Sequence, residues 1–269
     1  MKKNIDKHPW LYGIHAVREA LLNRHRHVHR IWIQERKDGA HHPLYAIAQA
    51  HRQGQQEGHL HIVPQRQLES VLPPHAVHQG VAAHVSPLAC PPWKTYCRDK
   101  TMLVILDHIQ DPHNIGAIIR SAWVFGVDGV LTTARHSPPL NGVIAKTACG
   151  GIEHVPLLPI SNVHHALLFL KTQGFHIFGL DAHGKTTLPA VCACSMPSQR
   201  VLVMGQEGRG LRHLTRAHCD NLVSIPYARG ETYAGAGKDG ERDACLPETS
   251  LNVSVSAGIA LYAMTARQA

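Results

Sequence analysis

The sequence predicts an α/β protein in which a small N-terminal α/β domain precedes a larger C-terminal domain with a parallel sheet. From residue 101 onward, short apolar runs alternate with helix-periodic segments, the order typical of a parallel sheet covered on both faces. Near Ser86 the composition shifts to "SPLACPPWKTYCRDK", whose prolines cannot continue a helix or an interior strand. We therefore divide the chain into three parts, at residues 1–85, 86–99 (a linker) and 100–269.

The N-terminal part is predicted to alternate short helices and strands. "GIHAVREALLN" at 13–23 is helix-periodic, and "HPLYAIAQAHRQG" at 42–54 is helical and ends at a glycine. "HRIWIQ" at 29–34 and "LHIVP" at 60–64 have the composition of strands. These four segments form a small α/β unit.

The C-terminal part opens with "MLVIL" at 102–106, an apolar run that ends at Asp107 and is typical of a fully buried parallel strand. The remaining segments continue the alternation. Further strands are predicted at 129–133, 175–181, 200–205 and 222–226, and helices at 114–126, 141–151, 163–174, 214–220 and 250–268.

Composition limits the compartment and the class of protein. With 44% hydrophobic and 17% charged residues, the 269-residue chain is typical of a folded protein. Its apolar runs stay well short of the ~20 residues that span a bilayer, and its first residues do not resemble a secretory signal. Seven cysteines, an odd number over a long chain, fit a reducing compartment. We expect a cytoplasmic protein with no membrane partner.

The charge points to a polyanionic partner. A formal net charge of +8 and a pI near 9.3 favour phosphate-rich ligands, because bound lysines and arginines release condensed counterions. The densest basic stretch is "RHRHVHR" at 24–30. This stretch is either a phosphate-contacting patch or the solvated end of a helix, and the sequence leaves both interpretations open.

The histidines and cysteines do not predict a metal site. The 23 histidines are spread throughout the chain, as a compositional bias would produce. Cys192 and Cys194 are separated by one residue, one fewer than in the hairpins of zinc sites, and no second pair lies at the required distance. We expect no metal.

The first of three polar junctions follows the strand at 102–106. In "DHIQDPHNIGAIIR", Asn114 is expected to cap a helix and Arg120 offers a planar, permanently charged fork about one and a half turns later. A helix N-terminus of this kind can hold a phosphate. The alternative is a capped helix with one exposed arginine.

Two further junctions follow later strands. "GQEGRGL" places Glu207 among glycines, which allow a ligand to approach the backbone closely, although a tight turn without a ligand is equally compatible. After Pro226, "SLNVSVSAG" begins a helix that Ser250 can cap and whose first turn displays Asn252. The alternative for this segment is an ordinary capped C-terminal helix.

Together these segments resemble the three motifs of the SpoU (TrmH) branch of the SPOUT RNA methyltransferases. "DPHNIGAIIR", "VLVMGQEGRGL" and "SIP…SLNVSVSAGIALY" follow the family order and lie on strand–loop–helix junctions. "YGIHAVREALL" and "VHQGVAAHV" are similar to the accessory domain of RlmB-type members, which methylate a guanosine ribose in large-subunit ribosomal RNA. The resemblance covers nearly the whole chain.

The resemblance implies a C-terminal domain with a deep trefoil knot that binds S-adenosyl-L-methionine and forms a homodimer. It also implies an RNA partner, 23S rRNA in preference to tRNA, and no DNA. The implied catalytic residues are Asn114, Arg120, Glu207, Ser250 and Asn252. The implied cofactor-binding residues are Met204, Gly205, Ile225, Pro226 and Leu251.

The implied chemistry is methyl transfer to a ribose 2′-hydroxyl, which consists mainly of positioning and of activating one oxygen. The family proposal makes the residue at the position of Arg120 a general base. A guanidinium with a pKa above ~12 is rarely a base, so electrostatic stabilisation of the oxygen and clamping of a phosphate are the simpler roles.

One segment departs from the family. Residues 227–249 join "IP" to "SLNVS", where close relatives use about six residues, so we infer an insertion at about 229–247. An active methyltransferase therefore competes with an RNA-binding relative of weakened cofactor affinity, and a tRNA enzyme stays a further alternative. The insertion carries a Gly-x-Gly-x-x-Gly spacing at 235–240. A dinucleotide-dependent oxidoreductase is disfavoured, because the expected strand and helix do not flank these glycines.

Overall fold

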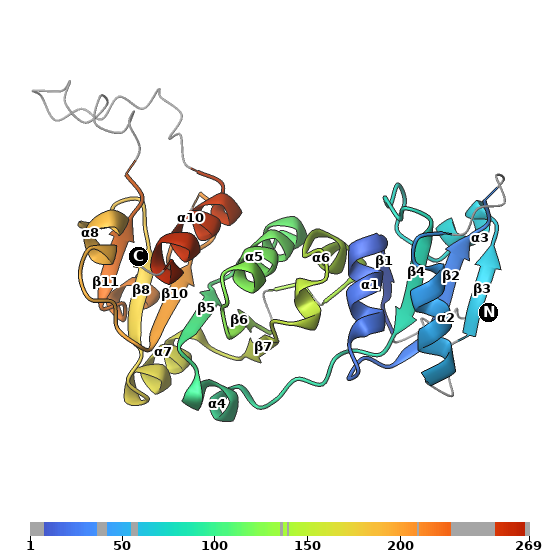
Figure 1. Cartoon of the computed structure of the whole chain (residues 1–269). Coiled ribbons are helices and arrows are strands. Elements are labelled where there is room, and N and C mark those ends of the chain that lie inside the picture. Colours follow the sequence, from blue (N-terminus) through green and yellow to red (C-terminus); the bar gives the residue numbers. More distant parts are fainter. Residues whose placement is uncertain are drawn as a thin grey trace, which may run out of the picture.

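The computed structural model describes residues 8–36, 42–54, 59–134, 137–138, 140–208, 210–226 and 251–266. They form an elongated molecule with a four-stranded sheet at the N-terminal end and a seven-stranded sheet beyond it (Figure 1). The predicted α/β class is confirmed. No helix among the described residues is long and apolar enough to cross a membrane.

The small sheet has the strand order β1-β4-β2-β3. Strands β2 and β3 are parallel, whereas β4 is antiparallel to both β1 and β2. Helices α1 and α2 bury their apolar sides against one face, and α3 contacts the other face through Leu68. The bounds are β1 Trp10–Tyr12, α1 Ile14–Leu22, β2 Val28–Gln34, α2 Tyr45–Gly54, β3 His59–Val63, α3 Gln65–Glu69 and β4 Val81–Val85.

The large sheet has the order β7-β6-β5-β10-β8-β11-β9, and every neighbouring pair in it is parallel. Its strands are β5 Met102–Leu106, β6 Gly129–Thr133, β7 Leu157–Ile160, β8 His176–Leu180, β9 Thr186–Thr187, β10 Arg200–Met204 and β11 Asn221–Ser224. Its helices are α5 Pro112–Val124, α6 Gly142–Thr147, α7 Val163–Thr172, α8 Leu188–Cys192, α9 His213–Ala217 and α10 Val253–Thr265, with a 3-10 turn, η2, at Gly151–Glu153.

Helices cover both faces of the large sheet, as predicted. On β5, Met102, Val104 and Leu106 pack with the side of the sheet that carries α5, α6, α8 and α10. Leu103 and Ile105 point the other way, into the cluster that includes α7. Because side chains alternate along a strand, a continuous apolar run such as 102–106 fits only a strand buried on both faces.

The parallel register brings the carboxyl ends of three strands to one edge. Met204 of β10 stands opposite both Leu106 of β5 and Leu180 of β8. The Asp107 backbone N–H donates to the Met204 carbonyl over 2.8 Å, so the two chains leave the sheet side by side. The loops after β5, β8 and β10 therefore begin next to one another.

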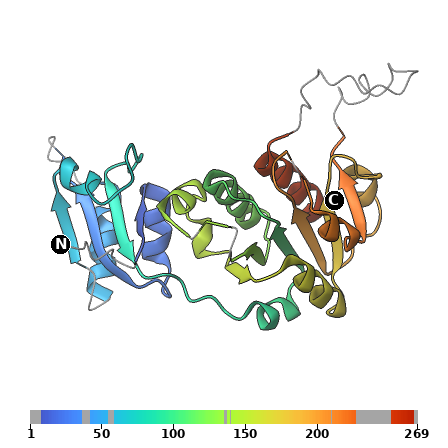
Figure 2. The ribbon, with the colours of Figure 1, turned by 180° about the vertical axis from the view of Figure 1, so that it is seen from behind.

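The segment predicted as a linker contains short helices. Residues 86–92 run beside the large domain to α4 (Trp93–Tyr96) and the 3-10 turn η1 (Cys97–Asp99) (Figures 1 and 2). Proline blocks continuation of a preceding helix but is compatible with a helix start, and Pro92 is the N-cap residue of α4. The proposed domain limits themselves stay a prediction.

The two domains pack closely through α6, η2, β1 and α1. A Cβ atom on Gly142 of α6 would lie 2.5 Å from the Trp10 carbonyl oxygen and from the Tyr12 ring. Gly150, at φ +92°, would place a Cβ 2.3 Å from the Glu19 side chain. Glycine at both positions allows the backbones to approach.

A buried ion pair joins the domains at the basic stretch 24–30. Arg26 and Glu153 have fully buried side chains, and their Nη2 and Oε1 atoms lie 2.5 Å apart. Arg26 Nη1 donates to the Ser86 carbonyl over 2.8 Å, and Asn23 Nδ2 donates to Glu153 Oε2 over 2.8 Å. For Arg26 both sequence interpretations were wrong, because a charge buried with a matched carboxylate cannot contact a phosphate or solvent.

We expect Glu153→Ala to destabilise the protein by about 3–5 kcal/mol, since it leaves the Arg26 guanidinium buried and unpaired. The double variant Arg26→Met/Glu153→Leu removes both charges and is expected to lose much less. Chemical denaturation followed by circular dichroism measures both. Equal losses in the two variants would contradict a dominant cost of the unpaired charge.

Candidate functional site

The first predicted junction starts α5 with a different cap. The side chain of Asp111 accepts a hydrogen bond from the His113 backbone N–H over 3.0 Å, and Pro112 occupies the first helical turn. The prediction that Asn114 caps this helix is therefore wrong. Asp111 stands two residues before His113, the separation a capping carboxylate needs, whereas Asn114 already belongs to the first turn. Its amide is buried and free to bond across the sheet edge.

Asn114, Glu207 and Asn252 share one hydrogen-bond network, although 138 residues separate the first from the last. Asn114 Nδ2 donates to Glu207 Oε2 over 3.1 Å. Asn252 Nδ2 donates to Asn114 Oδ1 over 3.1 Å and to Glu207 Oε1 over 3.4 Å. The structure thus brings together one predicted site residue from each of the three sequence motifs.

Asn252 is also the N-cap of α10. Its Oδ1 accepts from the backbone N–H groups of Ser254 over 2.9 Å and Val255 over 3.4 Å. The prediction placed Asn252 inside the helix and assigned the cap to Ser250, which lies outside the described residues. Because one side of the Asn252 amide caps α10 and the other reaches the network, its orientation is fixed at both ends.

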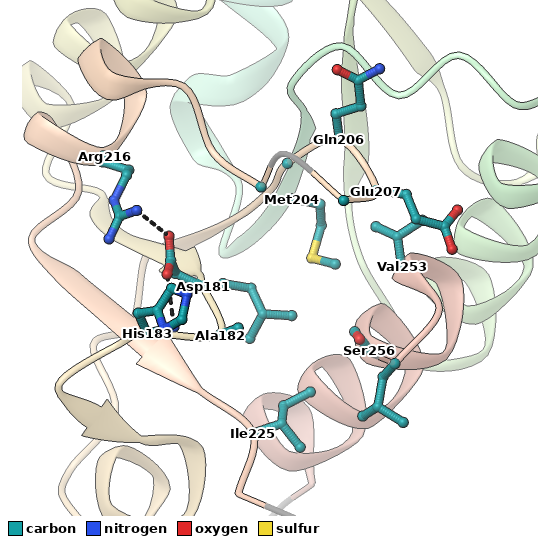
Figure 3. A pocket seen from close by; sticks show the side chains of 15 residues that line it. Asp181, Ala182, His183, Met204, Gln206, Glu207, Arg216, Ile225, Val253 and Ser256 are labelled. Carbon is teal, nitrogen blue, oxygen red and sulfur yellow. Dashed lines mark hydrogen bonds and ion pairs between the residues drawn. The ribbon is translucent and has the colours of Figure 1, made fainter. Parts of the chain in front are cut away.

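A pocket of about 460 Å³ opens beside this network at the carboxyl ends of β8 and β10 (Figure 3). Of the predicted cofactor residues, Met204, Gly205, Ile225 and Leu251 line it, together with Glu207. Its other lining residues are Leu180, Asp181, Ala182, His183, Gln206, Gly208, Gly210, Arg216, Val253 and Ser256. Pro226, Asn114, Asn252 and Arg120 do not line it.

The glycine-rich loop after β10 folds tightly on itself. Gly205 is buried, and a Cβ there would lie 2.2 Å from the Gly210 carbonyl carbon. Gln206 and Gly210 exchange backbone hydrogen bonds of 3.1 and 2.7 Å. The sequence predicted that these glycines let a ligand approach the backbone. In the structure they let two parts of the loop's own backbone approach each other, and the loop forms one wall of the pocket.

Sequence reasoning missed three charged or polar residues of the pocket. Asp181 follows β8 directly, and its carboxylate lies 3.3 Å from the Arg216 guanidinium, as Figure 3 shows. The Asp181 side chain also accepts from the His183 backbone N–H over 2.9 Å. The sequence did carry a signal for Asp181, because "FHIFGLD" ends with an aspartate directly after an apolar run, as the strand before Asp107 does.

Two further groups, the Asp107 carboxylate and the Cys219 thiol, have structural roles. Asp107 is buried, accepts from Thr215 Oγ1 over 2.6 Å and pairs with Arg212 at 2.7 Å, so it anchors α9. Burial, and after it the Asp220 carboxylate, raises the pKa of the Cys219 thiol to about 12. A thiol with so high a pKa is not a candidate nucleophile at neutral pH.

Arg120 is exposed on α5, and its guanidinium has no hydrogen bond or ion pair within the described part of the chain. It belongs to the helix whose first turn carries Asn114, but it stands apart from the pocket. Its guanidinium is available to an incoming ligand, and the structure does not bring it to the network.

The expectation of no metal site stays a prediction. In the described residues no group of three or more histidine, cysteine, aspartate or glutamate side chains could hold a metal ion. Cys194 Sγ contacts the Ala190 carbonyl at 3.5 Å as part of the turn after α8.

A pocket and a polar network at the carboxyl edge of a parallel sheet define a ligand-binding α/β protein. Residues 101–232 match the model of the SpoU rRNA Methylase family, and residues 10–90 match a model described as RNA 2'-O ribose methyltransferase substrate binding. This chain belongs to the SpoU rRNA methylase family, as its sequence motifs predicted.

Its sequence relatives extend over almost the whole chain. It is 35% identical over 264 residues to the 23S rRNA (guanosine-2'-O-)-methyltransferase RlmB of Salmonella typhi, covering 94% of this chain and 96% of the relative. It is 34% identical over 264 residues to RlmB of Escherichia coli K12, with the same two coverages.

Solved structures share the fold. The SpoU methyltransferase AviRb from Streptomyces viridochromogenes, in complex with the cofactor AdoMet, superposes with a TM-score of 0.72 at 19% identity, covering 96% of this chain and 89% of that one. An AdoMet-bound rRNA methyltransferase from Sinorhizobium meliloti gives a TM-score of 0.73 at 18% identity, covering 96% and 86%.

The network predicts an energetic coupling between Asn114 and Asn252. In a double-mutant cycle with Asn114→Ala and Asn252→Ala, we expect the two losses of unfolding free energy to deviate from additivity by about 1 kcal/mol, because each removes a partner of the other. Chemical denaturation measures the cycle.

The matched control is Asn162→Ala, which removes the side-chain cap of α7 on the opposite face of the sheet. Paired with Asn114→Ala, it is expected to be additive within about 0.5 kcal/mol. Equal coupling in both cycles would contradict the network.

Proposed function

We propose that this protein transfers a methyl group from S-adenosyl-L-methionine to the 2′-hydroxyl of a guanosine in 23S rRNA. The observation that carries the proposal is the Asn114–Glu207–Asn252 network, which joins the three SpoU motifs beside the pocket. The RlmB relatives, named for this reaction and matched over 94% of the chain, support the substrate.

The pocket fits the cofactor on its own chemistry. Its size lies within the ~300–1,000 Å³ of small-molecule sites, and apolar walls face a few fixed polar groups, as such sites require. Leu180, Ile225 and Leu251 offer surfaces for an adenine ring, while the backbone of residues 205–208 offers polar groups. Asp181, His183 and Arg216 supply charge and polarity on the side of the pocket across from Glu207 and Val253 (Figure 3).

We assign the positioning of the ribose and the activation of its hydroxyl to side chains of this protein. When bound, the cofactor supplies an activated methyl group on a sulfonium. Glu207 accepts from both asparagine amides and so fixes their orientation at the mouth of the pocket. Arg120, a permanent cation without a partner among the described residues, stabilises the developing charge on the ribose oxygen and clamps an adjacent phosphate.

Several finer features belong to the same proposal. We assign RNA binding to residues 1–85 and methyl transfer to 100–269, in the cytoplasm. The trefoil knot is part of the proposed fold of the second domain. Its closing segment, with Ser250 and the inserted residues 229–247, lies outside the described residues.

A second candidate is an RNA-binding relative with weakened cofactor affinity. The observation that favours it is the position of the insertion in the sequence, between Ile225 and Leu251, two residues that line the pocket. Calorimetric titration with S-adenosyl-L-methionine, with and without RNA, separates the candidates. Joining Ala228 to Glu248 by deletion then shows whether the insertion serves or impairs methyl transfer.

We expect labelled methyl groups to pass from S-adenosyl-L-methionine to unmodified 23S rRNA and not to bulk tRNA, with nuclease mapping to one guanosine.

Arg120→Lys is expected to lower kcat/KM by about 10²–10³-fold, because a single ammonium cannot replace the planar fork. Asn162→Ala serves as the control and is expected to keep its activity. Transfer to tRNA alone would overturn the substrate.

We also propose a homodimer through the C-terminal domain. Along α10, Val255, Ile259 and Tyr262 form an exposed apolar stripe at helical spacing, with relative residue exposures of 49%, 39% and 63%. On the adjacent α5, Val124 is also exposed, at 67%, and Phe125 contacts the Tyr262 ring edge-on. An exposed apolar stripe of this kind is typical of an interface.

Light scattering is expected to give twice the chain mass of 29.6 kDa for the wild type and the single mass for Val255→Asp/Tyr262→Asp. Buried carboxylates without partners would oppose association. The control is Leu214→Asp on α9, which is 61% exposed and lies off the stripe. A dimer that survives the double substitution would exclude this surface.

A further inference from the structure

The small N-terminal sheet has one face on which, among the described residues, α3 is the helix that packs. Leu11, Ile31, Ile33 and Ala83 point toward α1 and α2. Because side chains alternate along strands, Trp10, Trp32, His84 and their neighbours point to the opposite face. There, α3 and the turn after it cover the end around Tyr12, Val63 and Ala82, and Trp10 and Trp32, both partly buried, pack against this cluster.

The register places aromatic and basic side chains in two rows across this face. The first row runs Trp10, His84, Arg30, His59 from β1 to β3. The second row contains Trp32 opposite His61. We call Trp10, Arg30, Trp32, His59 and His61 the sheet platform.

The rings of the platform lie close to one another. The centroids of Trp10 and Trp32 are 4.8 Å apart, and those of Trp10 and the buried His84 are 5.0 Å apart. His59 and His61 lie 6.1 Å apart on β3. Both tryptophans are half-buried, which fixes their orientation and leaves part of each ring accessible.

The strand residues of this face carry no negative charge. Arg30, His59 and His61 are exposed, and the four strands contain no aspartate or glutamate at any position, whereas α3, which packs on one end of this face, ends at Glu69. Arg30 also belongs to the basic stretch 24–30, in which Arg26 is buried in the ion pair with Glu153. The stretch thus divides between a structural cation and a cation displayed on the platform.

We propose that the sheet platform binds a single-stranded segment of the RNA substrate, with bases against Trp10 and Trp32 and phosphates against Arg30, His59 and His61. Accessible aromatic rings beside an arginine and hydrogen-bonding side chains are the features that hold unpaired nucleotides without strict sequence preference. The proposal rests on the proposed function and adds to it a surface for the substrate away from the pocket.

Tryptophan fluorescence tests it directly on the full-length protein. The chain has four tryptophans, and Trp93→Phe/Trp123→Phe leaves only those of the platform. We expect a ten-nucleotide unstructured RNA to quench the fluorescence of this variant, because stacked bases quench indole. Lack of quenching, while labelled RNA still binds by anisotropy, would overturn the proposal.

Charge variants locate the binding face. Arg30→Ser/His61→Ser is expected to weaken RNA binding about 10-fold or more and to lower the salt slope by about one. The matched control, Arg24→Ser/His25→Ser, removes the same residue types from exposed positions of the same stretch that lie off the sheet, and is expected to change affinity less than 3-fold. Unfolding midpoints within a few degrees of wild type establish that both variants fold.

Equal losses in the platform variant and the control would mean a general basic surface and would overturn the proposal. Quenching by polyglutamate as strong as by RNA at the same ionic strength would overturn it as well. Methyl transfer separates this proposal from the proposed function. If the platform variant transfers methyl groups to rRNA at the wild-type rate and with an unchanged KM, the platform proposal is wrong and the proposed function stands. If RNA binding depends on the platform but the wild type transfers no methyl group, the proposed function is wrong and the platform proposal stands.

Discussion

The structure depends on the parallel register of β5, β10 and β8, which ends three strands at one level. Because Leu106, Met204 and Leu180 stand opposite one another, the polar segments after these strands have to share one edge of the sheet. The Asn114–Glu207–Asn252 network uses this proximity, and the pocket opens directly beside it. One main-chain constraint thus places the residues of distant motifs within hydrogen-bonding distance.

A second constraint fixes the small sheet relative to that edge. The buried Arg26–Glu153 pair, the close backbone approaches at Gly142 and Gly150, and the His154–Glu19 contact of 2.9 Å all lie between the two domains. A buried charge pair tolerates little displacement, because separation would leave both charges in an apolar environment. The N-terminal domain is therefore held at a defined place beside α6, η2 and the linker.

Much of the fold could be predicted because its signals are local. The strand at 102–106 and the strand at 129–133 begin and end where apolar runs do, and the helices at 114–126 and 163–174 were recognised with boundary differences of about two residues. Short elements such as β1 and β9, with three and two residues, carry too little pattern to be recognised. Asp111 and Asn252 replaced the expected caps, since capping depends on which side chain reaches the free N–H groups.

The sequence by itself determined the family, the alternation of strands and helices, and which polar segments follow buried strands, because periodicity and motif order are properties of neighbouring residues. Only the tertiary structure decided which of those side chains meet. It joined Asn114 to Glu207 and Asn252, left Arg120 exposed, added Asp181, His183 and Arg216 to the pocket, and buried Arg26 against Glu153. These outcomes depend on strand order and register, which bring together residues more than 30 positions apart and which no local pattern encodes.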